Sequence, residues 1–421
     1  MKSIQFSESI PVAASCDVLV AGGGVAGVAA ALSAARNGAK VILLEKQSWL
    51  GGLATTGLIN FWVPLCNGRG RLIIKGMAKE LFDLSLRYGM DTVPPDWKNG
   101  EPDKPTDQRC VSWFSSGIFA LQLLKNLRDT GVQIIYDCLV SAPVMDGTRC
   151  CGLIIDGKSG RQFFEAKTVI DAPGDADILL RAGVPTIDGD DYYTYLAEGI
   201  TLDGCRKAVA QNNIHLAYYR PHGGPSSLYG QGHPEGMPTF KGCSMELVND
   251  YLQSNQLLLL EKEKDKPRGE RNIHMLPSMI QLRTSRRIDG AATLTLEDCY
   301  HHCDTSIGVI CDFDNRDRLF EVPYGTLYHK DYGNLLTCGR SASAAGWGWD
   351  VLRVIPPAIL TGQAAGLAAA LACRDNCAAK DVNLPELQEK LADTGVVIHF
   401  PETWLPADTS ADSFAKLDGH M

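Results

Sequence analysis

The chain has 421 residues, which is enough for two or three domains at about 150 residues each. Its 40 basic and 49 acidic side chains give a formal net charge of −9, which excludes the basic face of a nucleic-acid-binding protein and the polybasic segment of a membrane-surface protein. A hydrophobic fraction of 45% permits a large core but is too low for a multi-span membrane protein.

A strand–helix–strand unit opens the chain. Residues 17–21 are short, apolar and rich in Val, and predict a buried strand that ends at the glycines 22–24. Residues 25–36 predict a helix, which Asn37 and Gly38 terminate. Residues 40–44 predict a second strand, so the order and length favour two parallel strands joined by a crossover helix.

The α/β pattern continues, is interrupted, and returns late in the chain. Residues 186 to about 324 are aromatic and turn-rich and bear most of the histidines, which indicates a different domain inserted into the first one. The sequence therefore predicts a discontinuous domain at 12–185 and 325–395, an inserted α+β domain at 186–324, and a tail at 396–421. Within the first domain we expect helices at 76–88, 116–129 and 356–373, and strands at 132–136, 168–171 and 334–338.

Three glycines between the first strand and helix match the dinucleotide-binding fingerprint G-x-G-x-x-G. Gly22 would make the tight turn, Gly24 would let a pyrophosphate approach the backbone, and Gly27 would let the helix pack closely on the strand. Glu45 ends the second strand, where a carboxylate binds ribose hydroxyls and repels a 2′-phosphate, so NADP is disfavoured. The single fingerprint and the discontinuous strands favour FAD over NAD.

The chain resembles the FAD-dependent oxidoreductase family of the glutathione-reductase-like, two-dinucleotide-binding-domain superfamily, although its single fingerprint predicts no second dinucleotide-binding domain of the disulfide-reductase kind. Segments 16–57 and 168–185 carry the resemblance first, as CDVLVAGGGVAGVAAALSAARNGAKVILLEKQSWLGGLATTG and TVIDAPGDADILLRAGVP. Later segments add RTSRRIDGAATLTLED, NLLTCGR and RVIPPAILTGQAAGLAAALA. The resemblance implies a Rossmann-like FAD-binding domain with a parallel sheet and non-covalently bound FAD.

The resemblance also implies which residues hold the cofactor. The pyrophosphate would lie on Gly22, Gly24, Val25, Ala26 and Gly27, and the adenosine ribose on Glu45 with Lys46 beside it. The adenine would contact Val140, and Gly174 and Asp175 would lie near the adenosine end of the site. The ribityl chain and the flavin would lie along Gly51, Gly52, Leu53, Ala54, Thr55 and Thr56.

Two later segments complete the implied cofactor site. Gly339 and Arg340 would lie near the pyrophosphate or ribityl chain, although relatives in the wider superfamily end this strand in Gly-Asp, and an arginine there could pair with phosphate oxygens. The first turns of the late helix would lie beside the flavin, where the helix start stabilises negative charge on the reduced ring. The residues implied are Gln363, Ala364, Ala365 and Gly366.

The residues for catalysis are harder to identify. Three arginines lie close together in the sequence, Arg283, Arg286 and Arg287, in a segment that could be a strand. They could bind an anion, either a substrate carboxylate or the FAD phosphates, or they could be ordinary solvated side chains. All nine histidines lie at or after His215, and His302 is a candidate base. The spacing C-x-H-H-C around His302 fits no zinc motif, so no metal is predicted.

The sequence favours an FAD-dependent dehydrogenase or oxidase that transfers a hydride between a small polar metabolite and the flavin. An isomerase, a hydratase or a structural flavin carrier without net redox turnover is the alternative, and a carrier fed electrons by a partner is a third. Fourteen cysteines without a CxxC pair, and an N-terminal segment without an apolar signal region, favour a cytoplasmic protein. No nucleic-acid or membrane partner is expected, and the substrate, electron acceptor and oligomeric state stay open.

Overall fold

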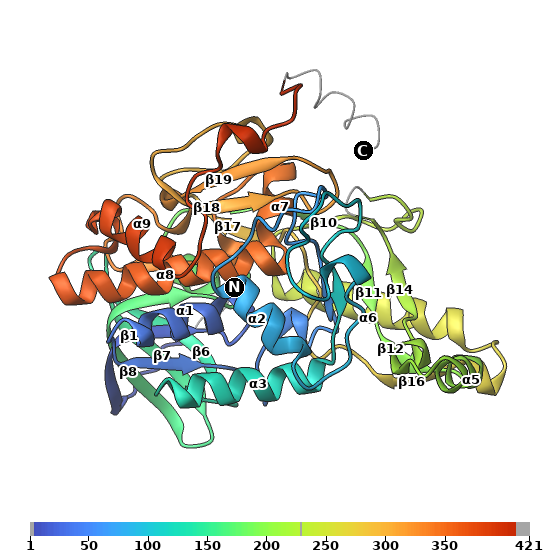
Figure 1. Cartoon of the computed structure of the whole chain (residues 1–421). Coiled ribbons are helices and arrows are strands. Elements are labelled where there is room, and N and C mark those ends of the chain that lie inside the picture. The colour runs from blue at the N-terminus through green and yellow to red at the C-terminus, as the bar shows by residue number, and fades with distance from the viewer. Residues whose placement is uncertain (1–3, 228–229, 410–421) are drawn as a thin grey trace.

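The computed structural model describes residues 4–227 and 230–409 (Figure 1). Its central sheet has seven strands in the order β5-β2-β1-β8-β7-β6, with β20 paired to the end of β8. Five of them run parallel: β5 (Gln133–Ile135), β2 (Val41–Leu44), β1 (Val12–Ala21), β8 (Gly160–Asp171) and β20 (Leu335–Thr337). The hairpin of β6 (Leu139–Asp146) and β7 (Arg149–Gly157) adds two antiparallel strands. This sheet confirms the predicted Rossmann-like α/β fold.

Two apolar helices pack against each other beside the sheet, α1 (Val25–Arg36) and α8 (Ile355–Asp375) (Figure 1). Glycines of α8 permit this contact, because a Cβ on Gly362 or Gly366 would lie 2.1 Å from the carbonyl oxygen of Ala26 or Ala30. By length and composition α8 could cross a membrane, but its most apolar window is entirely buried in the protein. It is therefore accounted for as the core helix of this domain.

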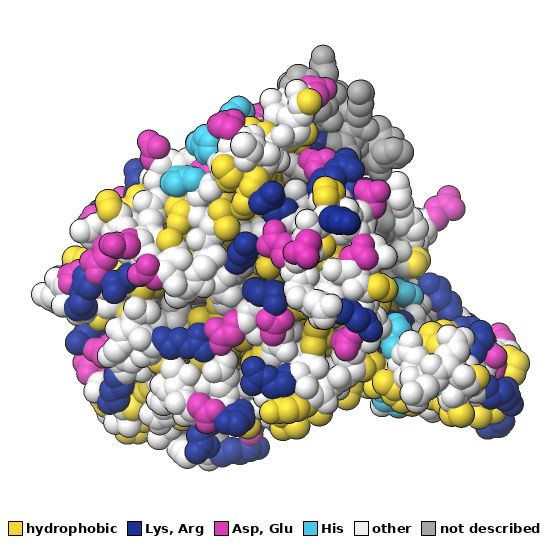
Figure 2. Space-filling view, viewed as in Figure 1, with side chains coloured by type: hydrophobic (Ala, Val, Ile, Leu, Met, Phe, Trp, Pro, Cys, Tyr) yellow, Lys and Arg dark blue, Asp and Glu magenta, His cyan; other side chains and the backbone are white. Residues whose placement is uncertain are grey.

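The remaining elements of the first domain flank this core. They include α2 (Met77–Leu86), α3 (Ser116–Asp129), α4 (Asp177–Arg181), α7 (Trp347–Arg353), α9 (Leu384–Asp393), and the short strands β3 (Phe61–Trp62) and β4 (Ser112–Trp113). On the face shown in Figure 2, acidic and basic side chains are interspersed rather than segregated. That face offers no broad basic surface of the kind that binds nucleic acid.

A second unit built from residues 186–288 has small sheets and two helices, α5 (Leu202–Gln211) and α6 (Met245–Glu263). It has cores of its own, one around Tyr193, Phe240 and Tyr251. Its strands are β9 (Thr186–Asp188), β10 (Asp190–Asp191), β11 (Thr194–Leu196), β12 (Glu198–Ile200), β13 (Tyr218–Tyr219), β14 (His222–Pro225), β15 (Phe240–Lys241), β16 (Asn272–Met275) and β17 (Arg286–Ile288).

The hairpin of β18 (Ser306–Cys311) and β19 (Leu319–Pro323) lies inside the insertion predicted at 186–324, yet it packs into the core of the first domain. Ile307 and Phe320 are fully buried there in the same apolar cluster as α1 and α8. The predicted tail at 396–421 also begins in this core, because Val396 and Phe400 are buried. The last part of that tail, residues 410–421, lies outside the described residues.

Candidate functional site

Two cavities meet at the carboxyl ends of the parallel strands, where open α/β sheets bind their ligands. The first, of about 720 Å³, is lined by the ends of β1, β2 and β8 and by β6. The second, of about 1060 Å³, extends from the start of α1 toward the second unit. Both volumes include space open to solvent, and both cavities are lined by Gly24, Ala172, Pro173 and Met279. A long ligand can therefore pass from one to the other over Gly24.

The glycine turn shows why each fingerprint position is glycine. Gly22 has φ +101°, and a Cβ on it would lie 2.5 Å from the carbonyl oxygen of Ala172, so it is required by the turn itself. A Cβ on Gly27 would lie 1.9 Å from the carbonyl oxygen of Gly22. Gly24 is different, because its φ is −64° and no atom lies within 4 Å of its Cβ position. Its missing side chain leaves the cavity open.

Gly24 also precedes α1, whose N-terminus faces both cavities at Gly24 and the second cavity through Val25 and Ala26. No side chain caps this helix, and its first turn contains no acidic residue. Free N–H groups and the positive end of the helix dipole favour a phosphate at such a position. The turn therefore fits the diphosphate of a dinucleotide.

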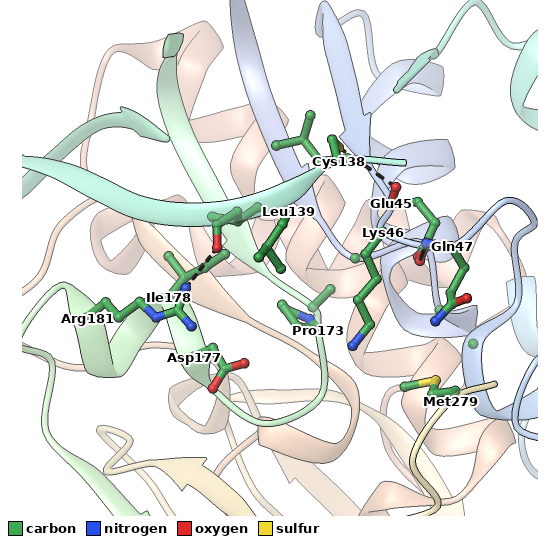
Figure 3. A pocket seen from close by; sticks show the side chains of 16 residues that line it. Glu45, Lys46, Gln47, Cys138, Leu139, Pro173, Asp177, Ile178, Arg181 and Met279 are labelled. Carbon is green, nitrogen blue, oxygen red and sulfur yellow. Dashed lines mark hydrogen bonds between the residues drawn. The ribbon is translucent and has the colours of Figure 1, made fainter. Parts of the chain in front are cut away.

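Glu45 follows β2 and is buried at the wall of the first cavity (Figure 3). Its Oε2 accepts a hydrogen bond from the backbone N–H of Gly23 at 2.6 Å, and its Oε1 accepts one from Gln47 at 2.7 Å. Burial raises the pKa of this carboxyl, and the two backbone bonds oppose the rise. Each oxygen keeps a lone pair for a ribose hydroxyl. Lys46 extends beside it toward Pro173 and Met279.

The opposite wall of the first cavity comes from β6 and α4. It includes Val140, which the sequence assigns to the adenine, together with Cys138 and Leu139. Arg181 was not predicted: its Nη1 donates to the carbonyl oxygen of Val140 at 2.8 Å and so fixes this wall. Its position in α4 gives no sequence signal, because the contact joins segments 41 residues apart.

The loop after β2 forms one side of the second cavity. Gly51, Leu53 and Ala54 line it, while Gly52 lines the first cavity. Thr55 and Thr56 lie behind the loop, and the hydroxyl of Thr56 donates to the carbonyl oxygen of Gly52 at 2.9 Å. These two threonines hold the loop in shape and line neither cavity.

Arg340 and Gly339 also line the second cavity, beside Gly174. The guanidinium of Arg340 donates to the Oδ1 of Asp175 at 2.6 Å and to the carbonyl oxygen of Gly174 at 2.8 Å. Its charge is thus balanced by Asp175, and the side chain is 6% exposed. Where the sequence suggested a phosphate ligand, the structure places an arginine that fixes the Gly174–Asp175 turn.

The helix start beside the second cavity is not at Gln363–Gly366. Helix α8 begins at Ile355, and the residues that line the cavity are Val354, Ile355 and Ala358. Gln363 lies two turns further along and accepts a hydrogen bond from the backbone N–H of Met77 at 2.9 Å. Ala364 and Ala365 are fully buried, and Gly366 packs on α1. The helix itself begins within one residue of its predicted start at 356, but the residues that face the cavity are those of its first turn rather than Gln363 to Gly366.

The three clustered arginines separate in the structure, because the strand β17 begins only at Arg286. Arg286 is buried and paired with Asp188 at 3.0 Å and Asp177 at 3.4 Å. Arg287 is also buried and donates to the Oγ of Ser343. Neither lines the cavities; Arg283 lines the second cavity, and Arg353 at the end of α7 joins it there.

His302 lies outside both cavities, in a cluster with Glu321 and His399 that clips the C-terminal segment to β19. The ligand atoms of these three residues lie within 4.8 Å of one another, as in a metal site. Hydrogen bonds already account for the cluster: the buried carboxylate of Glu321 accepts from both imidazoles at 2.8 Å, and from the backbone N–H groups of Cys303 and Phe400. His302 is therefore placed to stabilise the fold, not to exchange protons with a ligand of the cavities.

This cluster predicts a pH-dependent attachment of the C-terminal segment. Hydrogen bonds to Glu321 and then Glu402 raise the pKa of His302 above 6.5. A raised pKa in the folded state stabilises the protein below pH 6.5, and the effect is lost as the pH rises through the folded pKa. His302→Gln should remove this dependence, which is worth less than about 1 kcal/mol at a half-exposed site.

Hydrogen exchange of the Val396–Phe400 amides at pH 5.5 and pH 8.5 measures the attachment. Exchange should accelerate with pH, beyond its intrinsic base catalysis, in the wild-type protein and not in the variant. His301→Gln is the matched control, since His301 is exposed and its imidazole bonds the carbonyl oxygen of Glu297 rather than Glu321. Equal pH dependence in all three proteins would contradict the assignment.

Comparison with known proteins assigns a family to this arrangement. The family model described as FAD dependent oxidoreductase matches residues 17–220 and 245–391. Protein FixC of Escherichia coli O157:H7 is 30% identical over 178 residues, which cover 39% of this chain and 37% of FixC. A 4-oxocyclohex-2-ene-1-carboxylate 5-dehydrogenase of Sinomonas cyclohexanicum is 51% identical over 49 residues, 12% of this chain and 8% of that protein.

The chain thus aligns with well under half the length of these relatives. Among solved structures, p-nitrophenol 4-monooxygenase of Pseudomonas putida DLL-E4 is 14% identical, with a TM-score of 0.44, and the match covers 97% of this chain and 93% of that one.

Proposed function

Because the chain belongs to the FAD-dependent oxidoreductase family, we propose that it transfers a hydride between FAD and a small polar metabolite bound in the second cavity. The observation that carries this proposal is the meeting of the two cavities over Gly24, which leaves room for a dinucleotide in one and for its flavin and a substrate in the other. The placement within the glutathione-reductase-like superfamily stays a prediction.

The residues present fit FAD. The N-terminus of α1 and Gly24 would hold the diphosphate, and Glu45 would accept hydrogen bonds from the adenosine ribose. Val140 and Leu139 would contact the adenine, and the loop at 51–54 would contact the ribityl chain and flavin.

Bound FAD supplies the hydride acceptor or donor, and the protein supplies orientation and a tuned environment. The start of α8, at Val354 and Ile355, faces the second cavity and presents the positive end of a 21-residue helix. Positive potential there favours a group that gains negative charge on reduction. Ile59, Phe61 and Val63 form an apolar wall of the same cavity.

The lining of the second cavity favours redox turnover over the alternative without it. Among the described residues, no carboxylate, histidine or lysine lines this cavity. An isomerase or hydratase adds and removes protons at carbon or water through such groups. In an oxidation the flavin accepts the hydride, and the proton released from the hydroxyl or amine passes to solvent, to which this cavity is open.

We also propose a cytoplasmic location. All fourteen cysteines are free thiols in the structure. Reducing compartments keep thiols in this state.

Anaerobic reduction tests the function. The purified protein should be yellow, should release FAD on heating, and should lose its visible flavin absorbance when mixed without oxygen with its substrate. A panel of hydroxy acids, amines and sugars would sort the donors by class. A protein that takes up no FAD on reconstitution would refute the proposal, and a flavin that no member of the panel bleaches would favour the non-redox alternative.

A further inference from the structure

We infer that Arg283 and Arg353 form an anion subsite in the second cavity, so that the metabolite handled at the flavin carries a carboxylate. The inference rests on the proposed function, because it assigns the substrate class of the same cavity.

Arg283 is held with its guanidinium donors available. Its backbone N–H donates to both carboxylate oxygens of Asp191, at 3.0 and 3.1 Å, and this fixes the segment before β17. Its Nη1 donates to the carbonyl oxygen of Ser226 at 3.2 Å. Among the described residues no carboxylate lies within ion-pair distance of this guanidinium, and the side chain lines the cavity.

Arg353 reaches the cavity from the last position of α7. Its Nε and Nη2 both donate to the Oδ1 of Asp350, at 2.9 and 2.6 Å, which fixes the plane of the guanidinium. Its side chain is 11% exposed, and Nη1 is the group left without a described protein acceptor. Asp350 thus orients Arg353 without using all of its donors.

The two arginines lie near enough to repel each other. Burial, and next the charge of Arg353, lower the pKa of Arg283, while Asp191 opposes this effect. Two neighbouring cations in a partly buried cavity cost free energy that a bound anion recovers. Asp191 offsets charge but directs its oxygens at the backbone of Arg283, so the guanidinium donors that do not bond Ser226 stay available for a ligand.

A carboxylate suits this subsite better than a phosphate. The planar guanidinium fork binds the oxygens of a carboxylate or of a phosphate, so the rest of the lining decides between them. Three arginines are the charged side chains that line the cavity among the described residues. One of them, Arg340, is already paired with Asp175. The facing wall of Ile59, Phe61 and Val63 is apolar, which suits a hydrocarbon body with one acidic group.

Ligand binding without turnover tests the inference, with benzoate as the probe and benzamide as its neutral counterpart. Benzoate should perturb the visible spectrum of the FAD-loaded protein, and benzamide should bind at least about 10-fold more weakly. Arg283→Gln should weaken benzoate by at least about 10-fold and leave FAD affinity unchanged, and Arg353→Lys should weaken it in the same direction. Arg316→Gln, at an exposed arginine, should change neither.

The outcomes separate the inference from the function on which it rests. Equal binding of benzoate and benzamide, or undiminished benzoate binding in folded Arg283→Gln, would overturn the subsite. Loss of FAD affinity in that variant would also overturn it, because the arginine would then serve the cofactor phosphates. Benzoate binding without any donor that bleaches the flavin would support the subsite and favour the non-redox alternative. Bleaching by uncharged donors in a protein that does not bind benzoate would support the redox function and overturn the subsite.

Discussion

Gly24→Leu is expected to fold as the wild-type protein does and to bind FAD at least about 100-fold more weakly, a loss of roughly 2.8 kcal/mol. The backbone tolerates the change, since Gly24 has φ −64° and an added Cβ meets no atom within 4 Å. The same open space is where the two cavities join, so a leucine there occupies the path of the diphosphate. Quenching of FAD fluorescence on titration into apoprotein measures the affinity, and thermal unfolding checks the fold.

Gly117→Leu provides the matched control. Gly117 also has an open Cβ position, and it is exposed in the first turn of α3, away from both cavities. It should bind FAD like the wild-type protein. Gly22 is a poor site for this test, because its φ of +101° and its contact with Ala172 make any side chain disrupt the turn. Wild-type FAD affinity in Gly24→Leu would show that the diphosphate lies elsewhere.

The first strand–helix–strand unit could be predicted because its signals are local. Helices α1 and α3 begin and end at the predicted residues, and the turn between β1 and α1 is encoded by glycines within six positions. Strand β8 was predicted only at 168–171, but it begins at Gly160. Residues 160–163 are exposed or half-buried, and residues 164–167 alternate buried and exposed where β8 meets β7, so this part lacks the continuous buried run of residues 168–171.

Glycines in a helix can serve two structural purposes that the sequence does not distinguish. Glycine is needed where a cofactor approaches the backbone, and equally where two helices pack closely. In α8 the second requirement applies, because Gly362 and Gly366 meet carbonyl oxygens of α1. The sequence therefore located the right helix but placed its cofactor-facing start two turns too late.

The second cavity could not be assembled from the sequence, because its lining comes from distant segments. Phe61, Arg283 and Arg353 lie more than 200 residues apart at the extremes and meet only in the folded chain. Nor does clustering of charge in the sequence predict a ligand site. Arg286 lies three residues from Arg283, yet Asp188 and Asp177 take up its charge. Which arginine stays available depends on which carboxylates the fold brings to it.

Asp171, at the end of β8, should make a large contribution to the pH dependence of stability. Its side chain is fully buried, and its Oδ2 accepts the backbone N–H groups of Ile178 and Leu179 at 3.0 and 2.9 Å. Its Oδ1 has no described partner, so a proton can reside there. Burial is the largest cause that raises the pKa of this carboxyl from 3.8 to about 7.

The sign follows from the order of ionisation. Above about pH 4 the unfolded chain loses this proton, whereas the folded protein keeps it until about pH 7. The folded state therefore binds more protons in this window, and Asp171 makes stability fall as the pH rises from 4 to 7. The rise in the pKa of Asp171 from 3.8 to about 7 corresponds to roughly 4 kcal/mol in the free energy of unfolding. Asp171→Asn retains an oxygen for the two N–H groups and cannot ionise, so this contribution should vanish.

Denaturant unfolding of the wild-type protein and Asp171→Asn at pH 4.5 and pH 8 supplies the test. The quantity to compare is the difference between their free energies of unfolding at each pH. From pH 4.5 to pH 8 the stability of the variant relative to the wild-type protein should increase by several kcal/mol. A pH-independent packing cost of the substitution cancels in this comparison. Asp156→Asn is the control, since Arg161 lowers the pKa of Asp156 and its small effect has the opposite sign. Parallel stability profiles for wild type and Asp171→Asn would mean that Asp171 is already ionised at low pH, with an unseen cation or water on its Oδ1.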